Sequence, residues 1–228
     1  MVDAIYNGRS ARILYSADRL TAQSGLALDG QPELLFDYNE RFMELVRGLK
    51  PKRVLLLGGG AYTLPRAIID EFPSVDVTVI ELDEGLFAIG QEYFGVPYTK
   101  RLRVVHGDAV KELPEISAVF DLIIIDVFIG PLIPSGFQTA DFVHELQKHL
   151  AMQGTVAMNI IAGYYGQRSM SLRRQIASFE SAFSNVQLFP AGAETSLWTP
   201  QNFILTASNS TTDLQPFQRY KALELLTA

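Results

Sequence analysis

The fold of this chain is decided by residues 53–83, which read RVLLLGGGAYTLPRAIIDEFPSVDVTVIELD. An apolar run, Val54–Leu57, leads directly into a run of glycines at 58–60. A segment with a helical pattern follows, and a second apolar run, Val77–Ile80, stops at Glu81. This succession predicts a strand, a helix and a second, parallel strand, as in the first unit of a nucleotide-binding sheet.

The glycines and the acid together indicate a nucleotide site. Gly58, Gly59 and Gly60 let the backbone approach a ligand, and the helix that follows presents free N–H groups. Glu81 lies 21 residues after Gly60, and an acid at about that separation can accept hydrogen bonds from ribose hydroxyls. A glycine run after a strand can also be only a tight turn. The position of Glu81 favours the site, so we expect an adenosine-containing cofactor.

Composition narrows the class of protein. A length of 228 residues suits one α/β domain with a modest extension. A net charge of −6 argues against a broad nucleic-acid-binding surface and is compatible with a cationic substrate. Cysteine is absent, which excludes disulfides and thiolate chemistry. The few histidines do not suggest a metal site, since His144 and His149 would not share a helix face well.

No apolar run reaches the roughly 18 residues of a membrane-spanning helix. The start of the chain also lacks the charged and then apolar pattern of a signal peptide. We therefore expect a cytoplasmic protein with no membrane, nucleic-acid or metal partner.

Apolar runs of strand length alternate with helical patterns along the rest of the chain. The predicted core strands are 54–57, 77–80, 103–106, 122–125, 155–159, 186–189 and 202–207. Near-continuous apolar strands between helices indicate a sheet that is buried on both faces. A loop of about a dozen residues without a helical pattern joins the last two strands, which predicts an antiparallel finish. The fold class is therefore α/β, with a doubly wound, mostly parallel seven-stranded sheet and an antiparallel last strand.

Helical spacing of apolar residues predicts the connecting helices and a smaller N-terminal unit. The predicted helices are 35–49, 64–71, 86–94, 110–113, 139–150, 169–183 and a helical tail at 214–226. Residues 1–33 carry short apolar runs broken by turn formers such as Asp29-Gly30, which predicts a small antiparallel β extension. We expect two units, the β extension at 1–33 and the main domain at 34–228.

Polar groups stand at the carboxyl ends of the first four predicted core strands, where ligands bind in an open α/β sheet. After the glycines and Glu81 come Asp108 and Asp126. Asp108 could accept a hydrogen bond from the adenine amine, and Ala109 leaves room for the ring. An acid at the third strand favours S-adenosylmethionine or a relative over NAD. Asp126 stands where the reactive end of the cofactor should point, and a carboxylate there can hold or deprotonate an amine.

The chain resembles the spermidine synthase family, within the larger class of S-adenosylmethionine-dependent methyltransferase folds. The matching segments are FDYNERF (36–42), VLLLGGGAYTLPRAI (54–68), VIELDEGLFAIGQEYFG (79–95), RLRVVHGDAVKEL (101–113) and FDLIIIDVFIGPLIP (120–134). The resemblance implies that residues 34–228 form a methyltransferase-like domain. It also implies that the cofactor is S-adenosylmethionine or its decarboxylated form and that the acceptor is a small molecule, possibly an amine.

The resemblance also implies a role for each candidate residue. The residues implied to hold the nucleoside are Gly58, Gly59, Gly60, Glu81, Asp108, Ala109 and Gln23. Asp126 matches the base that acts on the attacking amine, while Tyr38 and Glu40 match a Tyr-x-Glu element near the polyamine channel. Tyr38 is therefore a candidate catalytic residue and Glu40 a candidate substrate contact. Tyr164, in a glycine-flanked loop after the fifth strand, is a further candidate for the substrate site, as part of a lid or of an exposed turn.

Three departures from the family pattern bear on the reaction. Aminopropyl-transferring members have an acid directly after the glycines, where this chain has Ala61, and a second acid three residues after the base, where it has Ile129. Their paired glycines are replaced by Tyr62 and Thr63. A buried ammonium without its carboxylate costs several kcal/mol, so the departures weigh against efficient spermidine synthesis.

Three functions stay open from the sequence. The chain could transfer a methyl or aminopropyl-type group to a small acceptor, could be a true polyamine aminopropyltransferase, or could be a non-catalytic nucleoside-binding member. The missing acid at Ala61 favours the first over the second, and the retained Asp126 and Tyr38 disfavour the third. The N-terminal β segment could pair across a homodimer, as extensions do in related synthases. Trp198 could cap the substrate pocket or pack beneath a loop.

Overall fold

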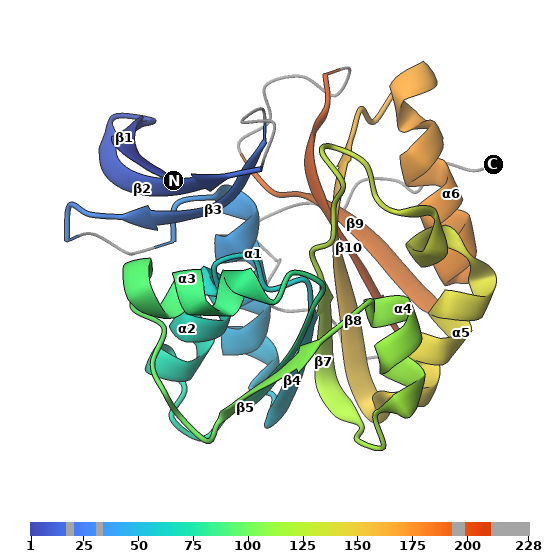
Figure 1. Cartoon of the computed structure of the whole chain (residues 1–228). Coiled ribbons are helices and arrows are strands. Elements are labelled where there is room, and N and C mark those ends of the chain that lie inside the picture. Colours follow the sequence, from blue (N-terminus) through green and yellow to red (C-terminus); the bar gives the residue numbers. More distant parts are fainter. Residues whose placement is uncertain (17–20, 31–33, 193–198, 211–228) are drawn as a thin grey trace.

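The computed structural model describes residues 1–16, 21–30, 34–192 and 199–210. The predictions for Trp198 and for a helical tail at 214–226 fall outside these ranges. The described chain forms a large sheet with helices around it and a small sheet at its N-terminal end (Figure 1).

The large sheet has seven strands in the order β6-β5-β4-β7-β8-β10-β9. Their bounds are β4 (Arg53–Leu57), β5 (Asp76–Glu81), β6 (Leu102–His106), β7 (Phe120–Ile125), β8 (Leu150–Ala162), β9 (Asn185–Pro190) and β10 (Gln201–Ser208). β10 is antiparallel to both of its neighbours, β8 and β9, while the strands from β6 to β8 pair in parallel. The predicted fold class is confirmed, including the antiparallel last strand.

Within the described ranges, six α-helices pack around the sheet. They are α1 (Asp37–Leu49), α2 (Thr63–Glu71), α3 (Gly85–Tyr93), α4 (Ala109–Glu112), α5 (Ala140–Lys148) and α6 (Met170–Glu180), with short 3₁₀ turns at Leu113–Glu115, Ser135–Gln138 and Gln167–Ser169. Each corresponds to a predicted helix, although α5 and α6 end earlier than predicted. No helix in the described ranges is long and apolar enough to cross a membrane.

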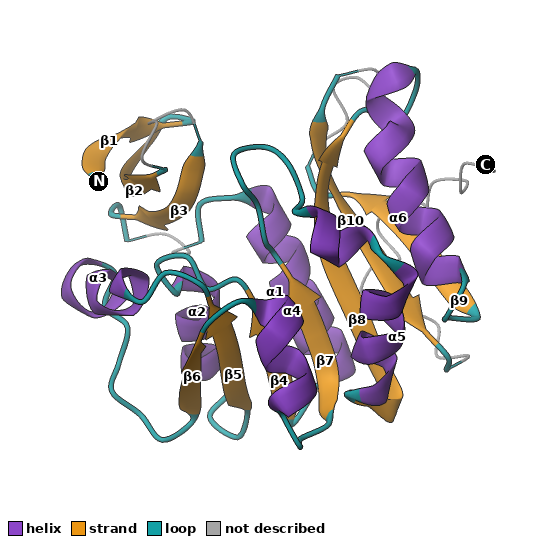
Figure 2. Ribbon diagram, turned by 45° about the vertical axis from the view of Figure 1, so that its right-hand side comes forward, coloured by secondary structure: helices purple, strands orange, loops and turns teal. Residues whose placement is uncertain are grey.

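The helices cover both faces of the sheet because side chains alternate along each strand. Leu55 and Leu57 of β4 belong to a core cluster that includes side chains of α5 and α6. Val54 and Leu56 point the other way, into a cluster that includes side chains of α1 and α2. Figure 2 shows α5 and α6 on one side of the sheet and α1 on the other. Residues 54–57 of β4 and 122–125 of β7 are therefore buried on both faces, whereas no residue of the edge strand β6 is buried.

The N-terminal sheet is antiparallel, in the order β1-β2-β3, with bounds β1 (Val2–Tyr6), β2 (Arg9–Tyr15) and β3 (Ala22–Ala27). It confirms the predicted β extension but contains a strand, β1, that was not predicted. The turn between β1 and β2 is Asn7-Gly8, and both residues have positive φ, 49° and 78°. An Asn-Gly pair between strands is the sequence signal for this hairpin, and it would have located β1.

Candidate functional site

A cavity of about 530 Å³ lies at the carboxyl ends of β4 to β8 and is partly covered by β3 and the start of α1. This is within the usual size range for a small-molecule site. Most of the residues predicted to form the site line the cavity. These residues are Gln23, Tyr38, Gly58, Gly59, Gly60, Glu81, Asp108, Ala109 and Asp126.

Backbone hydrogen bonds align the carboxyl ends of the neighbouring parallel strands along one edge of the sheet. The Gly58 N–H donates to the Ile80 carbonyl and the Asp126 N–H donates to the Leu57 carbonyl, each over 2.9 Å. The Gly107 N–H likewise donates to the carbonyl of Glu81 over 2.9 Å. Each bond continues a parallel ladder one step beyond its strand. The loops after β4, β5, β6 and β7 therefore open at the same edge of the sheet.

The glycine turn is closely packed against other parts of the chain. Gly58 has φ of 89°, and a Cβ at this position would lie 2.3 Å from the backbone oxygen of Asp126. Gly60 has φ of 51°, and a Cβ there would lie 2.5 Å from Oγ of Ser24 in β3. We expected the glycines to let the backbone approach a ligand. The structure shows that the glycines also serve packing within the chain. The missing side chain of Gly58 lets the end of β7 approach the turn, and that of Gly60 lets β3 approach it.

Glu81 holds the glycine turn in place. Its Oε2 accepts hydrogen bonds from the N–H groups of Gly59 (2.6 Å) and Gly60 (3.1 Å). Its Oε1 accepts from the Asp83 N–H over 2.9 Å. The side chain is buried yet lines the cavity. Since each carboxylate oxygen can accept more than one hydrogen bond, Glu81 can order the turn and still face a ligand.

Asp108 and Ala109 form the third strand end. Asp108 is the N-cap of α4, and its Oδ1 accepts from the Val110 N–H over 3.0 Å. Such a cap satisfies one of the free N–H groups at a helix start. Ala109 is buried beneath the cavity, so its small side chain sets the floor there.

Asp126 ends a chain of side-chain hydrogen bonds. Nδ2 of Asn159 donates to Oδ1 of Asp126 over 2.9 Å, and Nδ2 of Asn202 donates to Oδ1 of Asn159 over 2.9 Å. The side chain of Tyr38 also lies near Asp126, and each of the two groups affects the pKa of the other. Asn159 and Asn202 both line the cavity and were missed by the sequence analysis. The available signal was that Asn159 is an amide at the carboxyl end of a predicted strand.

The environment of Asp126 changes its acid–base behaviour. Burial raises the pKa of Asp126 to about 6, while the hydrogen bond from Asn159 and the nearby side chain of Tyr38 act in the opposite direction. Burial and the nearby Asp126 carboxylate raise the pKa of Tyr38 well above its ordinary value. Tyr38 is therefore a neutral donor at physiological pH, and Asp126 is a carboxylate that can take up a proton.

The charged lining of the cavity has one sign. Glu81, Asp83, Asp108 and Asp126 contribute carboxylates, and no lysine, arginine or histidine in the described parts of the chain lines the cavity. A cationic ligand is therefore favoured there over an anionic one.

The residues that depart from the family pattern differ in where they lie relative to the cavity. Ala61 and Tyr62 are fully buried and lie outside the cavity lining. The Ala61 N–H donates to Oγ of Ser24 over 2.8 Å, and the Tyr62 N–H donates to the Gly59 carbonyl over 2.8 Å. Ile129, by contrast, lines the cavity and is 70% exposed.

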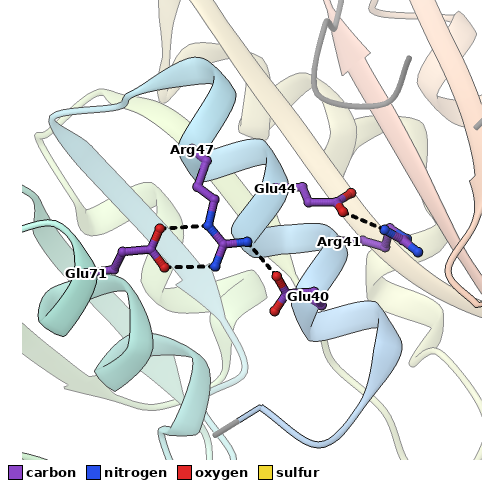
Figure 3. A network of polar contacts seen from close by, with 5 residues as sticks. All are labelled: Glu40, Arg41, Glu44, Arg47 and Glu71. Carbon is purple, nitrogen blue, oxygen red and sulfur yellow. Dashed lines mark hydrogen bonds and ion pairs between the residues drawn. The ribbon is translucent and has the colours of Figure 1, made fainter. Parts of the chain in front are cut away.

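Glu40 does not line the cavity, and its role as a substrate contact stays a prediction. Its carboxylate pairs with Arg47, and the same guanidinium binds both carboxylate oxygens of Glu71 over 2.7 and 2.8 Å (Figure 3). Glu40 and Arg47 are two helical turns apart in α1, and Glu71 is in α2. The helical spacing of Glu40 from Tyr38 turns it toward α2, away from the cavity.

Tyr164 is also outside the cavity lining, and its role in the substrate site likewise stays a prediction. The side chain is 4% exposed and belongs to the core cluster on the α5 and α6 side. Its ring lies against that of Tyr165, with centroids 4.8 Å apart, and against Phe203. The apolar contacts of the ring account for its burial.

The comparison with known proteins agrees with this geometry. Residues 35–189, more than half of the chain, match the spermine/spermidine synthase domain. The chain belongs to this family. A family relative, the polyamine aminopropyltransferase of Vibrio vulnificus, is 26% identical over 196 residues. That match covers 78% of this chain and 64% of the relative, so the chain spans less than two thirds of the relative's length.

Solved structures show the same fold. A probable spermidine synthase from Corynebacterium glutamicum aligns with a TM-score of 0.76 at 22% identity, over 92% of this chain and 81% of that one. Human methyltransferase-like protein 13, solved in complex with SAH, aligns with a TM-score of 0.65 at 19% identity, over 81% of this chain and 92% of that one. The fold of this family member is therefore shared by spermidine synthases and methyltransferases.

Proposed function

We propose that this family member binds S-adenosylmethionine or its decarboxylated form in the cavity and transfers a methyl or aminopropyl-type group to a small amine. The observation that carries the proposal is the buried Asp126 carboxylate in a cavity whose charged side chains, among the described residues, are all acidic. Such a cavity suits a sulfonium donor and an ammonium acceptor, which are both cations.

The nucleoside is assigned to the end of the cavity formed by β4, β5 and β6. There Glu81 would accept from the ribose hydroxyls, and Asp108 from the adenine amine above Ala109. Gln23 of β3 lines the same cavity and would contact the cofactor from the opposite side. When bound, the cofactor supplies an electrophilic carbon next to a positively charged sulfur.

Asp126 is assigned as the catalytic base and Tyr38 as its catalytic partner. In its ionised form, Asp126 holds the ammonium group of the acceptor and accepts a proton from it, which frees the nitrogen lone pair for attack. Asn159 keeps the carboxylate oriented through its hydrogen bond, and Tyr38 lies beside it as a neutral hydroxyl. The pKa of about 6 for Asp126 leaves it ionised at physiological pH and able to exchange a proton.

Methyl transfer is the preferred reaction. Ala61 provides no carboxylate for the ammonium that remains in decarboxylated S-adenosylmethionine, and its side chain is fully buried. The carboxylate of ordinary S-adenosylmethionine could instead be received at the start of α2, where Thr63 and Leu64 line the cavity. The first N–H groups of a helix have no partner within the helix and bind anions.

Aminopropyl transfer is the second candidate, and one observation favours it. No basic side chain of the described residues lines the cavity, so a donor without a carboxylate would also be tolerated. The Vibrio vulnificus relative is named as a polyamine aminopropyltransferase. A third possibility is a nucleoside-binding protein without turnover. We further propose that residues 1–33 form a β extension to a methyltransferase-like domain at 34–228.

Calorimetry tests these alternatives. The chain is titrated with S-adenosylmethionine, its decarboxylated form, S-adenosylhomocysteine and methylthioadenosine. We expect tightest binding of S-adenosylmethionine or S-adenosylhomocysteine, whereas a strong preference for the decarboxylated form would restore aminopropyl transfer. No binding of any of the four would overturn the proposed function. Glu40→Gln is the control variant, because Glu40 lies outside the cavity lining and should not alter binding.

A further inference from the structure

We propose that the acceptor is an amine with one ammonium group and an apolar or aromatic remainder, rather than a diamine or polyamine. This inference rests on the proposed function and names the acceptor class for the same cavity. It follows from the side chains beyond Asp126, at the end of the cavity away from β5 and β6.

The acceptor end of the cavity has a largely apolar wall. Phe128 and Ile129 come from the loop after β7, and Ile161 comes from β8. Tyr6 of β1 and Phe36, just before α1, contribute aromatic rings from the opposite side and pack edge to face, with centroids 5.6 Å apart. Such a wall favours contact with alkyl or aromatic groups of an acceptor.

Among the described residues that line this end of the cavity, Asp126 is the one carboxylate that can pair with a positive charge. The other acids of the cavity, Glu81, Asp83 and Asp108, belong to the ends of β5 and β6. The described polar neighbours of Asp126 are uncharged. They are Tyr38, whose pKa is raised well above its ordinary value, and the amide of Asn159, which is joined in turn to Asn202. One ammonium can therefore pair with Asp126, and a second would face uncharged groups.

Ile129 is the position at which the absence of a second carboxylate can be tested. It sits in a tight turn in which Ile129 and Leu132 exchange backbone hydrogen bonds of 2.8 and 3.2 Å. The two side chains are similarly exposed, at 70% and 69%. Of these two residues, Ile129 lines the cavity and Leu132 does not. The pair thus provides a test position and a matched control in one turn.

The main alternative is that a diamine binds with its second ammonium group at Asp37, a carboxylate near the cavity. Asp37 lines a separate, smaller pocket of about 240 Å³ that shares Tyr6, Phe36, Tyr38 and Asn202 with the main cavity. A diamine could reach Asp37 only by extending past these shared residues. We infer that acceptors do not place a second ammonium group at Asp37. Diamines of two lengths, 1,4-diaminobutane and 1,6-diaminohexane, are therefore included in the experiment to test whether either one reaches this carboxylate.

The central comparison is between hexylamine and 1,6-diaminohexane, which have the same carbon chain and differ in the second amino group. Transfer from S-adenosylmethionine and from its decarboxylated form is measured by mass spectrometry with hexylamine, phenethylamine, 1,6-diaminohexane and 1,4-diaminobutane. We expect kcat/KM for hexylamine to exceed that for 1,6-diaminohexane about tenfold or more, the ratio for one unpaired charge. A preference of the unmodified chain for either diamine would overturn the inference.

Two variants sharpen the result. Ile129→Asp should raise the diamine-to-monoamine ratio of kcat/KM about tenfold by supplying the second carboxylate. Leu132→Asp, with the same charge change in the same turn, should leave the ratio unchanged. Equal shifts in the two variants, or no shift in Ile129→Asp, would contradict the role given to Ile129.

Failure of this inference can be told apart from failure of the proposed function. If no nucleoside ligand binds and no amine is modified, the proposed function fails, and the acceptor inference fails with it. If methylthioadenosine binds but no transfer occurs, calorimetry of the four amines against the methylthioadenosine-loaded chain decides. Tighter binding of a monoamine supports the inference, and tighter or equal binding of a diamine overturns it.

Discussion

Asn159 donates a hydrogen bond from Nδ2 to Oδ1 of Asp126 over 2.9 Å, which joins β8 to the end of β7 in the lining of the cavity. The orientation of the Asn159 amide is fixed from behind, because its Oδ1 accepts from Asn202 of β10. The antiparallel strand thus contributes to the site on the parallel part of the sheet. Three strands determine how one carboxylate faces the cavity.

We predict that Asn159→Ala raises the pKa of Asp126 further. The Asn159 hydrogen bond stabilises the ionised form, so its loss should move the titration upward from about 6 by about one unit. The carboxyl carbon shift of Asp126, followed by NMR against pH, measures this. Asn202→Ala, which removes only the second link, should give a smaller upward shift. A downward shift in Asn159→Ala would contradict the assignment.

Asp126→Asn should stabilise the fold while strongly lowering turnover. The folded-state pKa of about 6 lies above the ordinary value of 3.8, so ionisation of Asp126 costs stability at every pH above about 6. The cost, about 2–3 kcal/mol, decreases as pH falls and is absent below about pH 4, where the group is neutral in both states. The variant should therefore unfold at a higher temperature at about pH 8 and at an unchanged one at about pH 4.

The same Asp126→Asn sample tests the catalytic assignment. Nucleoside affinity should be nearly unchanged, and turnover should fall about 10²–10⁴-fold, the usual contribution of a general base. For the unmodified chain, kcat/KM should rise as pH increases through about 6, because only the ionised form can accept the proton. Unaltered turnover per folded molecule would make Asp126 a structural residue.

Glu81→Ala should weaken nucleoside binding and also lower stability. Loss of a charged acceptor for ribose should cost about 1.5–3 kcal/mol of binding free energy. The variant also leaves the N–H groups of Gly59, Gly60 and Asp83 without their acceptor, so the melting temperature should fall. Calorimetry and thermal unfolding separate the two effects. Glu84→Ala is the control, since Glu84 is exposed and outside the cavity lining.

Gly58→Ala should destabilise the chain far more than Gly8→Ala. Both glycines have positive φ, 89° and 78°, so both variants carry the backbone strain, which costs roughly 1–2 kcal/mol. A Cβ at Gly58 would also meet the backbone oxygen of Asp126 at 2.3 Å, whereas nothing lies within 4 Å at Gly8. Urea unfolding should show about 2 kcal/mol or more between the variants. Equal losses would mean that the turn relaxes around the added methyl group.

The sequence predicted the large sheet well because its signals are local. Buried strands such as Val54–Leu57 are uniformly apolar, and the helices between them repeat apolar residues at helical spacing. The carboxyl-end polar residues followed from the rule that parallel strands open at one edge. Chain order alone placed Glu81, Asp108 and Asp126 at a common edge.

The contacts between distant segments could not be predicted in the same way. The Asp126–Asn159–Asn202 chain depends on which strands are neighbours and on their register. The direction of Glu40 on α1 is set by its pairing with Arg47, which also binds Glu71 of another helix. Nothing in the local sequence shows that partnership.

The docking of β3 on the glycine turn has a consequence for dynamics. Ser24 accepts from the Ala61 N–H and occupies the space where Gly60 would carry a Cβ, so the turn and the small sheet meet directly. Opening of β3 would expose that amide, and a ligand held between them would oppose the opening. Ligand binding should therefore slow hydrogen exchange in β2 and β3, on strands that lie outside the seven-stranded sheet. Affinity for the cofactor would then depend in part on how firmly the N-terminal segment is attached.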